Sequence, residues 1–240
     1  VSGHSKKPTP GPLPNEKPTP APNPVSNPAP PKKPVAVPSG KAVSDISNNV
    51  SKFYRGFSEA QIAATGAQRI KIGSQTIYIG TQQVTSINQN PIISSFDSKN
   101  PANNWTRTDY ETSGTDGRGL GLLWTGIDLY GFFSVDGTQD TPSQDFRRAA
   151  SGASQAWLRS YGRGGGTRIG VIGKIDPATG KLQKAAHLSA VLSNGQSNSL
   201  SVTGATVNGA GNVVIQAKSF FNPRRPNGSP LKKNAGNNAG

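Results

Sequence analysis

The chain has 240 residues, a formal net charge of +14, two histidines and no cysteine. Its length corresponds to one domain with tails, and the lack of cysteine excludes disulfides and thiolate metal sites. Two histidines do not suffice for a structural zinc site, so we expect no metal and no other cofactor. No apolar run approaches the roughly 20 residues of a membrane helix, so we expect no membrane span.

Much of the positive charge lies in the two tails. This indicates contact with an anionic polymer or surface, or simply solvated tails. The chain also lacks methionine and begins at Val1. That start is typical of signal-peptide removal, with methionine trimming or an arbitrary boundary as alternatives. Together with the Pro-, Thr-, Asn- and Gly-rich composition, it predicts a secreted or cell-surface protein.

Residues 1–40 form a proline-rich segment with the run KKPTPGPLPNEKPTPAPNPVSNPAPPKKPVAVP. Proline fixes φ and removes a backbone donor, so we expect an extended segment rather than a helix or a paired strand. The segment is predicted to be a linker, or an arm that docks on a neighbouring subunit, represented by Pro8, Pro20, Pro30 and Pro34. Thr9 and Thr19, each flanked by prolines, are candidates for O-linked glycosylation.

Two helices are expected next. The first covers residues 44–57, where apolar side chains spaced for one helical face recur at Ile46, Val50, Phe53 and Phe57. The second covers residues 58–64, where Gln61 completes a capping box with Ser58 and Gly66 supplies the stop. Both apolar faces are expected to pack on the domain's own core, with a partner-binding helix as the alternative.

Residues 68–83 predict a hairpin, with strands at 69–72 and 76–79 and a turn that begins at Gly73. Ile70 and Ile72 alternate with Arg69 and Lys71. This alternation indicates one buried and one solvent-facing side.

The central stretch, residues 91–135, alternates aromatic and β-branched runs with turn-forming Gly, Pro, Asn and Asp. It predicts a four-stranded antiparallel meander. A weaker copy covers residues 168–220 at an offset of about 80 residues, with Asp97 matching Asp176 directly after an apolar strand. Each copy has one apolar side that it cannot bury alone.

The chain resembles the blades of secreted bacterial β-propeller repeat proteins in its strand ending at Asp97, its Trp105-Thr-Arg-Thr strand, its Gly-Thr-Asp-Gly turn and its closing Asn-Val-Val-Ile. The whole chain is also similar to uncharacterised exported proteins of photosynthetic bacteria. The first resemblance implies propeller-blade-like meanders. A closed propeller needs at least four blades, so a sandwich is the alternative. We therefore expect a mainly β, antiparallel domain over residues 41–221.

Residues 136–166 separate the two copies. Thr141 and Pro142 favour a helix or loop that ends by residue 154, followed by a strand at 157–161 and a flexible basic loop at 161–168. Residues 222–240 lack apolar periodicity, so we expect a disordered or extended basic tail.

Two groups of carboxylates are candidates for chemistry. Asp109 and Glu111 share one face of a predicted strand, about 7 Å apart, which suits a glycosidase. Nothing nearby is expected to raise either pKa, and an edge strand with solvent-facing charge is the alternative. Asp136, Asp140 and Asp145 are a candidate calcium loop, with a plain polar loop as the alternative because the helix-loop-helix spacing is missing.

Three further motifs are weaker. Residues 152–156 resemble a nucleophile elbow without its second glycine. His187 lies in strand-like sequence and is predicted to be structural. Residues 162–166 resemble a phosphate-binding loop or an Arg-Gly RNA segment, but they lack the Gly-Lys-Ser/Thr ending and any repetition. A loop between sheet elements is favoured, and nucleic-acid binding is not expected.

Six aromatic residues gather in the central stretch: Trp105, Tyr110, Trp124, Tyr130, Phe132 and Phe133. Most are expected in the core, because aromatic side chains dominate core energetics. Those that face outwards are candidates to stack on sugar rings. The candidate carbohydrate contacts are Trp105, Tyr110 and Trp124.

These features predict an exported structural or assembly protein of the cell surface, a subunit of an extracellular filament or lattice. An incomplete repeat set leaves strand edges open for another chain, so the expected partner is the protein itself. The alternative is an extracellular polysaccharide-binding module, and a glycoside hydrolase ranks below both. We expect no enzyme and assign no catalytic, cofactor-binding or metal-binding residue.

Overall fold

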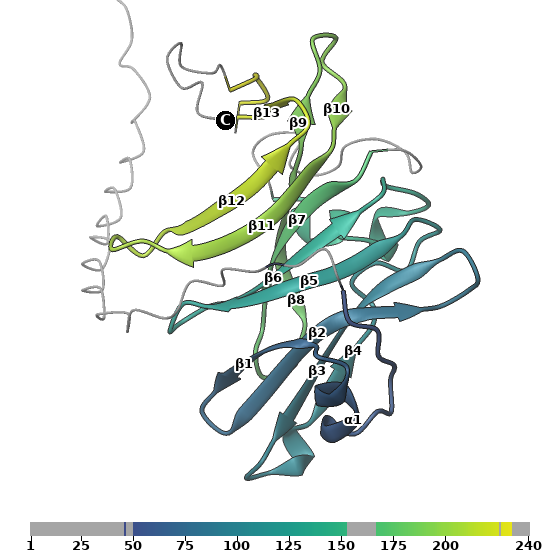
Figure 1. Ribbon diagram of the computed structural model, residues 1–240, viewed down its shortest axis with the longest axis vertical. Helices are drawn as coiled ribbons and strands as arrows, with labels where there is room; N and C mark the ends of the chain where they lie inside the picture. Colours follow the sequence, from purple (N-terminus) through teal and green to yellow (C-terminus); the bar gives the residue numbers. More distant parts are fainter. Residues whose placement is uncertain (1–45, 47–49, 153–166, 226, 232–240) are drawn as a thin grey trace, which may run out of the picture. The chain divides into compact units, whose positions relative to one another are not determined.

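Antiparallel β-strands make up most of the regular secondary structure that the structure describes, which confirms the predicted fold class (Figure 1). The computed structural model describes Ile46 and residues 50–152, 167–225 and 227–231. The proline-rich arm with Thr9 and Thr19, most of the elbow-like motif, the strand predicted at 157–161 and the glycine-rich loop lie outside these residues. All described residues belong to the compact unit Pro34–Gly240.

The first sheet has the order β1-β2-β3-β4, with β1 (Gln68–Ile72), β2 (Gln75–Gln83), β3 (Gln89–Asp97) and β4 (Trp105–Arg107). The predicted hairpin is confirmed, because β1 pairs with β2 across a turn in which Gly73 has a φ of 59°. Ile70 and Ile72 are half-buried, whereas Arg69 and Lys71 are exposed, so the predicted alternation is also confirmed.

The second sheet has the order β5-β6-β7-β8, with β5 (Gly117–Trp124), β6 (Leu129–Val135), β7 (Ile169–Ile175) and β8 (Leu182–Leu188). The predicted meander is therefore wrong, because β3 and β4 belong to the first sheet and β5 and β6 to the second. The cause lies after β4, where the chain turns inwards and buries Tyr110 and Glu111 completely. A segment that enters the core leaves its sheet, so β5 begins a new one.

The two matched aspartates each stabilise the turn after a strand. Asp97 Oδ1 accepts the backbone N–H of Lys99 at 2.9 Å, and Asp176 Oδ1 accepts that of Ala178 at 3.0 Å. Such side-chain-to-backbone bonds are typical of aspartate in turns. The Asn103 amide and the Lys99 N–H together lower the pKa of Asp97 to about 2, because both stabilise the carboxylate.

The C-terminal strands form two smaller sheets. β9 (Ala190–Val191), β10 (Ser197–Asn198) and β13 (Asn222–Pro223) have the order β10-β9-β13, and β11 (Leu200–Val207) pairs with β12 (Val213–Ser219) in a hairpin. The prediction of a disordered or extended tail therefore misses the pairing of its first residues. Arg224 holds them, since its backbone N–H donates to Ser189 O at 3.0 Å and its guanidinium donates to Gly195 O at 3.1 Å.

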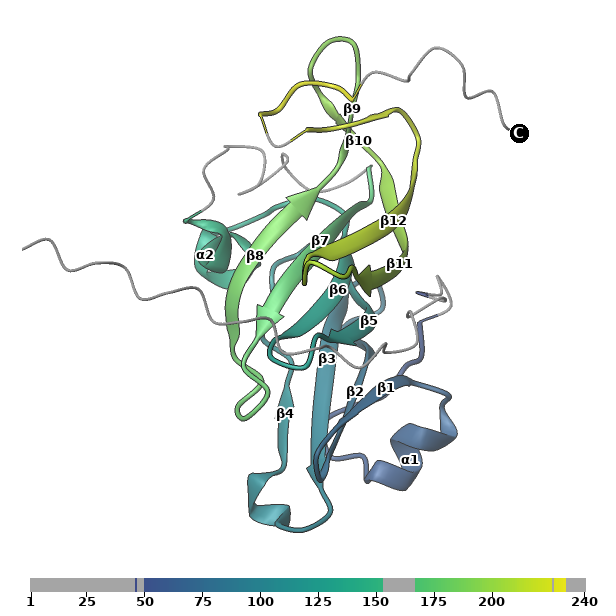
Figure 2. The same ribbon diagram turned by 90° about the vertical axis from the view of Figure 1, so that its left-hand side faces the viewer.

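Three hydrophobic clusters hold the described part of the chain together. The largest lies between the two four-stranded sheets and joins Ile77 and Ile93 to Phe133 and Val171. The second joins the outer side of the β5–β8 sheet to the β11–β12 hairpin, and the third joins α1 (Glu59–Ala64) to the β1–β4 sheet. Figure 2 shows the hairpin against β6 and β7 and the helix beside β1. This layering matches the sandwich alternative.

Of the two predicted helices, only the second forms. α1 begins after Ser58, whose hydroxyl accepts the Gln61 N–H while Gln61 accepts the Ser58 N–H, as predicted. The helix predicted over residues 44–57 is wrong over residues 50–57, where residues 51–53 run beside β2 and residues 54–57 form a turn. There the Phe53 N–H donates to Thr81 O at 3.2 Å and the Phe53 side chain is completely buried. Burial of this ring against β2 stabilises the chain more than a helix over these residues would. Gly56 has a φ of 91°, which would end such a helix in any case.

Three short helical turns complete the described chain. η1 (Pro101–Asn103) joins β3 to β4, and η2 (Pro142–Gln144) is followed by α2 (Arg147–Ala150). The predicted helix start at Thr141 and Pro142 is confirmed as a single turn. Gln144 Oε1 accepts the Thr141 N–H at 3.0 Å, which satisfies a backbone donor at the start of that turn.

Candidate functional site

The three candidate carbohydrate contacts do not form a common platform. Tyr110 is completely buried and donates its hydroxyl to Gly180 O at 2.7 Å, so it is not available to stack on a sugar. Trp105 is half-buried, packs beside Gly180, and donates its indole N–H to Pro177 O at 3.1 Å. Trp124 is half-buried against the core between the sheets. Tyr110 therefore has a structural role that its sequence position did not indicate.

The structure separates Asp109 from Glu111. β4 ends at Arg107, so neither carboxylate lies on a strand, and the predicted pairing on one strand face is wrong. Asp109 is exposed and accepts from Arg107 Nε at 2.9 Å. Glu111 is completely buried, and no described group forms a hydrogen bond with its Oε2 atom.

Glu111 also has a shifted pKa, which the sequence did not predict. Burial raises its pKa to about 7, because a carboxylate loses its hydration inside the protein. Bonds from the Ser113 N–H at 2.8 Å and from the Ser113 and Thr115 hydroxyls to Glu111 Oε1 oppose that shift only in part. Because Asp109 is exposed and Glu111 is completely buried, these two carboxylates do not form the pair predicted for a glycosidase.

Arginines pair with two of the three carboxylates of the candidate calcium loop: Asp136 lies 3.0 Å from Arg168 and 3.3 Å from Arg118, and Asp145 lies 2.7 Å from Arg147. The third, Asp140, accepts the Gly114 N–H at 3.3 Å. In the ranges that the structure describes, no three His, Cys, Asp or Glu side chains gather around a common point. His187 is buried on β8 opposite Val171, consistent with the structural role predicted for it.

β12 is the last strand of a two-stranded sheet. On one side β12 pairs with β11 from Leu200↔Ser219 to Val207↔Val213. No described strand pairs with its other side, as Figure 1 shows. We call this seven-residue row of backbone groups the β12 edge; its sequence is VVIQAKS.

The side chains of the β12 edge are unusually apolar for an open strand. It contains no proline and one charge, Lys218. Val214 is 45% exposed, and directly after the strand Phe220 and Phe221 are 66% and 48% exposed. Natural sheets protect an open edge with proline, several charges or a covering segment. The β12 edge has no proline and a single lysine, and no described strand covers it.

The opposite side of the hairpin is partly occupied. The Ile46 N–H donates to Thr203 O at 3.2 Å, and Thr203 lies at the irregularity between Val202 and Gly204 of β11. A bulge breaks the regular row of donors and acceptors that a new strand would need. The free side of the hairpin is therefore that of β12.

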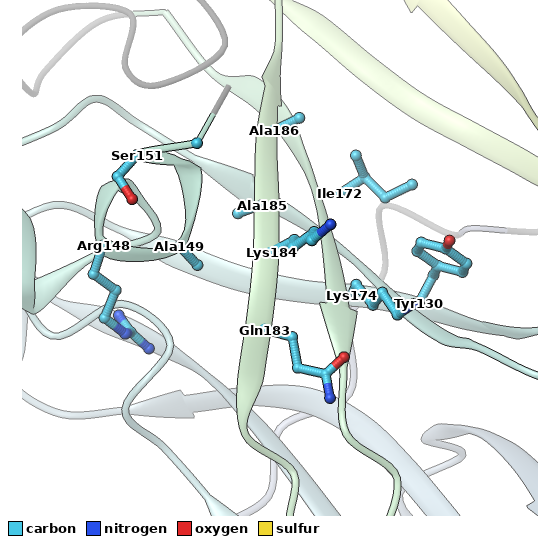
Figure 3. Close-up of a pocket in the computed structure, with 11 residues that line it drawn as sticks. Tyr130, Arg148, Ala149, Ser151, Ile172, Lys174, Gln183, Lys184, Ala185 and Ala186 are labelled. Atoms are coloured by element: carbon cyan, nitrogen blue, oxygen red, sulfur yellow. The ribbon is translucent and has the colours of Figure 1, made fainter. Parts of the chain in front are cut away.

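A cavity of 690 Å³ lies around β8, the last strand of its sheet (Figure 3). On one side of β8 are side chains of the sheet's outer face, and on the other side are those of α2. We call the side chains on the sheet's outer face the lysine face, and they are the part of the cavity that suits a ligand. They are Tyr130, Ile172, Lys174, Lys184 and Ala186. Sequence reasoning missed this face, because only the strand register brings its members together.

The described chain is thus a mainly β protein of stacked antiparallel sheets, with an open hairpin edge and a lysine-lined cavity. Within the described residues, no helix is long and apolar enough to cross a membrane. No protein-family model, no curated protein and no solved structure matches the chain.

Proposed function

We propose that this chain is a subunit of an extracellular assembly, in which the β12 edge pairs with the β12 edge of a second copy. The observation that carries the proposal is the open side of β12, seven residues long and without proline. Unpaired backbone donors and acceptors on an exposed strand are a template for another strand. The chain's composition, rich in proline and glycine, suits an extracellular location.

Charge favours an antiparallel pair of β12 strands. The protein carries a net charge of +14, so two copies repel each other at long range. At the edge itself only Lys218 is charged. A twofold axis at Gln216 would place Lys218 opposite Val214, so that no two lysines face each other. Salt screens the long-range repulsion, and assembly should therefore strengthen as the salt concentration rises.

Replacement of Val214 by lysine should prevent assembly. The side chain is 45% exposed, so Val214→Lys leaves the fold intact while adding a charge to the edge. Thr206→Lys is the matched control, because Thr206 is the register partner of Val214 on β11 and the new charge lies on the same hairpin but away from the edge. Mass is measured by light scattering during size-exclusion chromatography over a concentration series.

The expected mass of the wild type and of Thr206→Lys rises with concentration, whereas Val214→Lys stays at the mass of one chain. A wild type that remains a single chain at every concentration and salt level contradicts the proposal. Equal loss of assembly in both variants also contradicts it, because repulsion anywhere on the hairpin would then suffice.

A filament or lattice needs a second contact besides a closed pair of β12 strands. We propose that the proline-rich segment, residues 1–40, supplies it by lying along a neighbouring subunit. A variant that lacks residues 1–40 should still form the pair but not larger species. Electron microscopy of both proteins tests this, and fibres or sheets of equal abundance without the segment would contradict its role.

A further inference from the structure

We propose that the lysine face binds an anionic sugar unit of an acidic polysaccharide, through a carboxylate or a sulfate ester. This binding site is separate from the β12 edge. The proposed assembly would then bind a polysaccharide at the lysine face and a second copy of the chain at the β12 edge. Its members come from three neighbouring strands, β6, β7 and β8.

The strand register forms the site. Tyr130 is the direct partner of Lys174, and Lys174 is the direct partner of Lys184, so the three side chains form one row across the sheet. In the next row, Ile172 is the partner of Ala186. Directly opposite side chains have Cβ atoms about 5 Å apart, which lets two lysine amines reach one oxyanion. Figure 3 shows Lys174 and Lys184 on the same side of β8 as Tyr130 and Ile172.

The two lysines are unequally neutralised. Lys174 Nζ lies 2.8 Å from Asp128 Oδ1, in the turn before β6. Lys184 is exposed, and the described residues provide it with no acidic partner. Like charges directly opposite each other weaken a sheet. A bound anion would reduce the repulsion between Lys174 and Lys184. It would also pair with Lys184, whose charge Asp128 does not neutralise.

The surroundings of the lysines suit a ring-shaped ligand. Ile172 and Ala186 add apolar surface beside the charged row, and Tyr130 adds an aromatic ring. Ile172 and Tyr130 also pack against the hydrophobic cluster beneath the β11–β12 hairpin, so only part of each side chain faces the cavity. A tyrosine side chain suits a partly buried position, because its ring packs on apolar groups while its hydroxyl stays in contact with water. The lysine face accounts for part of a cavity whose total volume, on both sides of β8, is 690 Å³. The same cavity is also lined by Ser151 and Arg148, which lie on the other side of β8.

Binding is tested by calorimetry with three oligosaccharides of equal length, a sulfated heparin fragment, a polyuronate fragment and neutral dextran. Both anionic probes, or one of them, should bind, and dextran should not. Lys184→Gln should weaken binding about tenfold, the usual loss for one charge-assisted contact. Lys184→Arg should restore most of the affinity, because arginine keeps the charge.

Lys71→Gln is the matched control. Lys71 is an exposed lysine on β1 of the other large sheet and does not line the cavity. It should leave affinity unchanged. An equal loss in Lys71→Gln would show diffuse attraction to a basic protein and overturn the site. Binding of dextran with the affinity of the anionic probes, or no binding of either anionic probe, would also overturn it. The mass of the protein is followed in the same samples, so that loss of assembly is not mistaken for loss of binding.

Discussion

Gly119→Ala is expected to lower the free energy of unfolding by about 3 kcal/mol, the upper end of the usual cost of overpacking a core. A Cβ atom at Gly119 would lie 2.5 Å from Gly80 O and 2.6 Å from Ile79 Cγ1. The backbones of β5 and β2 meet here, since the Gly119 N–H also donates to Thr81 Oγ1 at 3.2 Å. A backbone carbonyl cannot move aside without disturbing the strand pairing around it.

Gly209→Ala is the control, because a Cβ atom there would meet nothing within 4 Å. Gly209 lies in the turn between β11 and β12, outside the contact of the two large sheets. Urea denaturation of both variants gives the comparison. If Gly119→Ala were as stable as Gly209→Ala, then β5 would not cross β2 as closely as the structure indicates.

Glu111→Gln should stabilise the protein above pH 7 and have little effect near pH 4. The pKa of Glu111 is about 7 in the folded protein, against an ordinary value of 4.5, because the carboxyl group is buried. Between these two values the folded state binds more protons than the unfolded state. The wild type therefore loses stability as pH rises through this window, by about 3 kcal/mol in total, and stays on a plateau above it.

The glutamine variant lacks this proton and should lose less stability across the same window. Its amide oxygen can still accept the Ser113 N–H, which bonds to Glu111 Oε1 at 2.8 Å in the wild type. Thermal unfolding from pH 4 to pH 8 measures the difference. Parallel profiles for the two proteins would show that Glu111 titrates in the folded state as it does in the unfolded chain.

Local features of this fold could be predicted from the sequence. The capping box of Ser58 and Gln61 and the hairpin turn at Gly73 depend on residues that lie close together in the chain. Turn residues and caps act through their immediate neighbours. For that reason these elements appear where the residues predict them.

Features that depend on distant contacts could not be predicted. Apolar spacing alone placed Phe53 in a helix, whereas its ring is buried beside Gly80, a neighbour that no local pattern reveals. The strand runs of residues 91–135 were found, but their division between two sheets follows from the burial of Tyr110 and Glu111.

The candidate sites show the same limit. Lys174 and Lys184 are ten positions apart in the sequence, and only the β7–β8 register makes them partners. The open side of β12 likewise depends on which strand is last in its sheet. The sequence predicted that open edges exist, because the repeats are incomplete, but it did not indicate which strand provides one.

The most direct test of the central claim uses the absence of cysteine from the chain. Single cysteines are introduced at three exposed positions of the β12 edge, Val214→Cys, Gln216→Cys and Lys218→Cys, with Lys71→Cys as the control on β1. Opposite side chains of paired strands have Cβ atoms about 5 Å apart, and a short bis-maleimide joins two such cysteines whether or not their backbone pair is hydrogen-bonded. We predict that at least one of the three forms a cross-linked dimer with this reagent, more strongly as concentration rises, while Lys71→Cys stays monomeric. If none of the three cross-links more than Lys71→Cys, the β12 edge does not pair with a second copy.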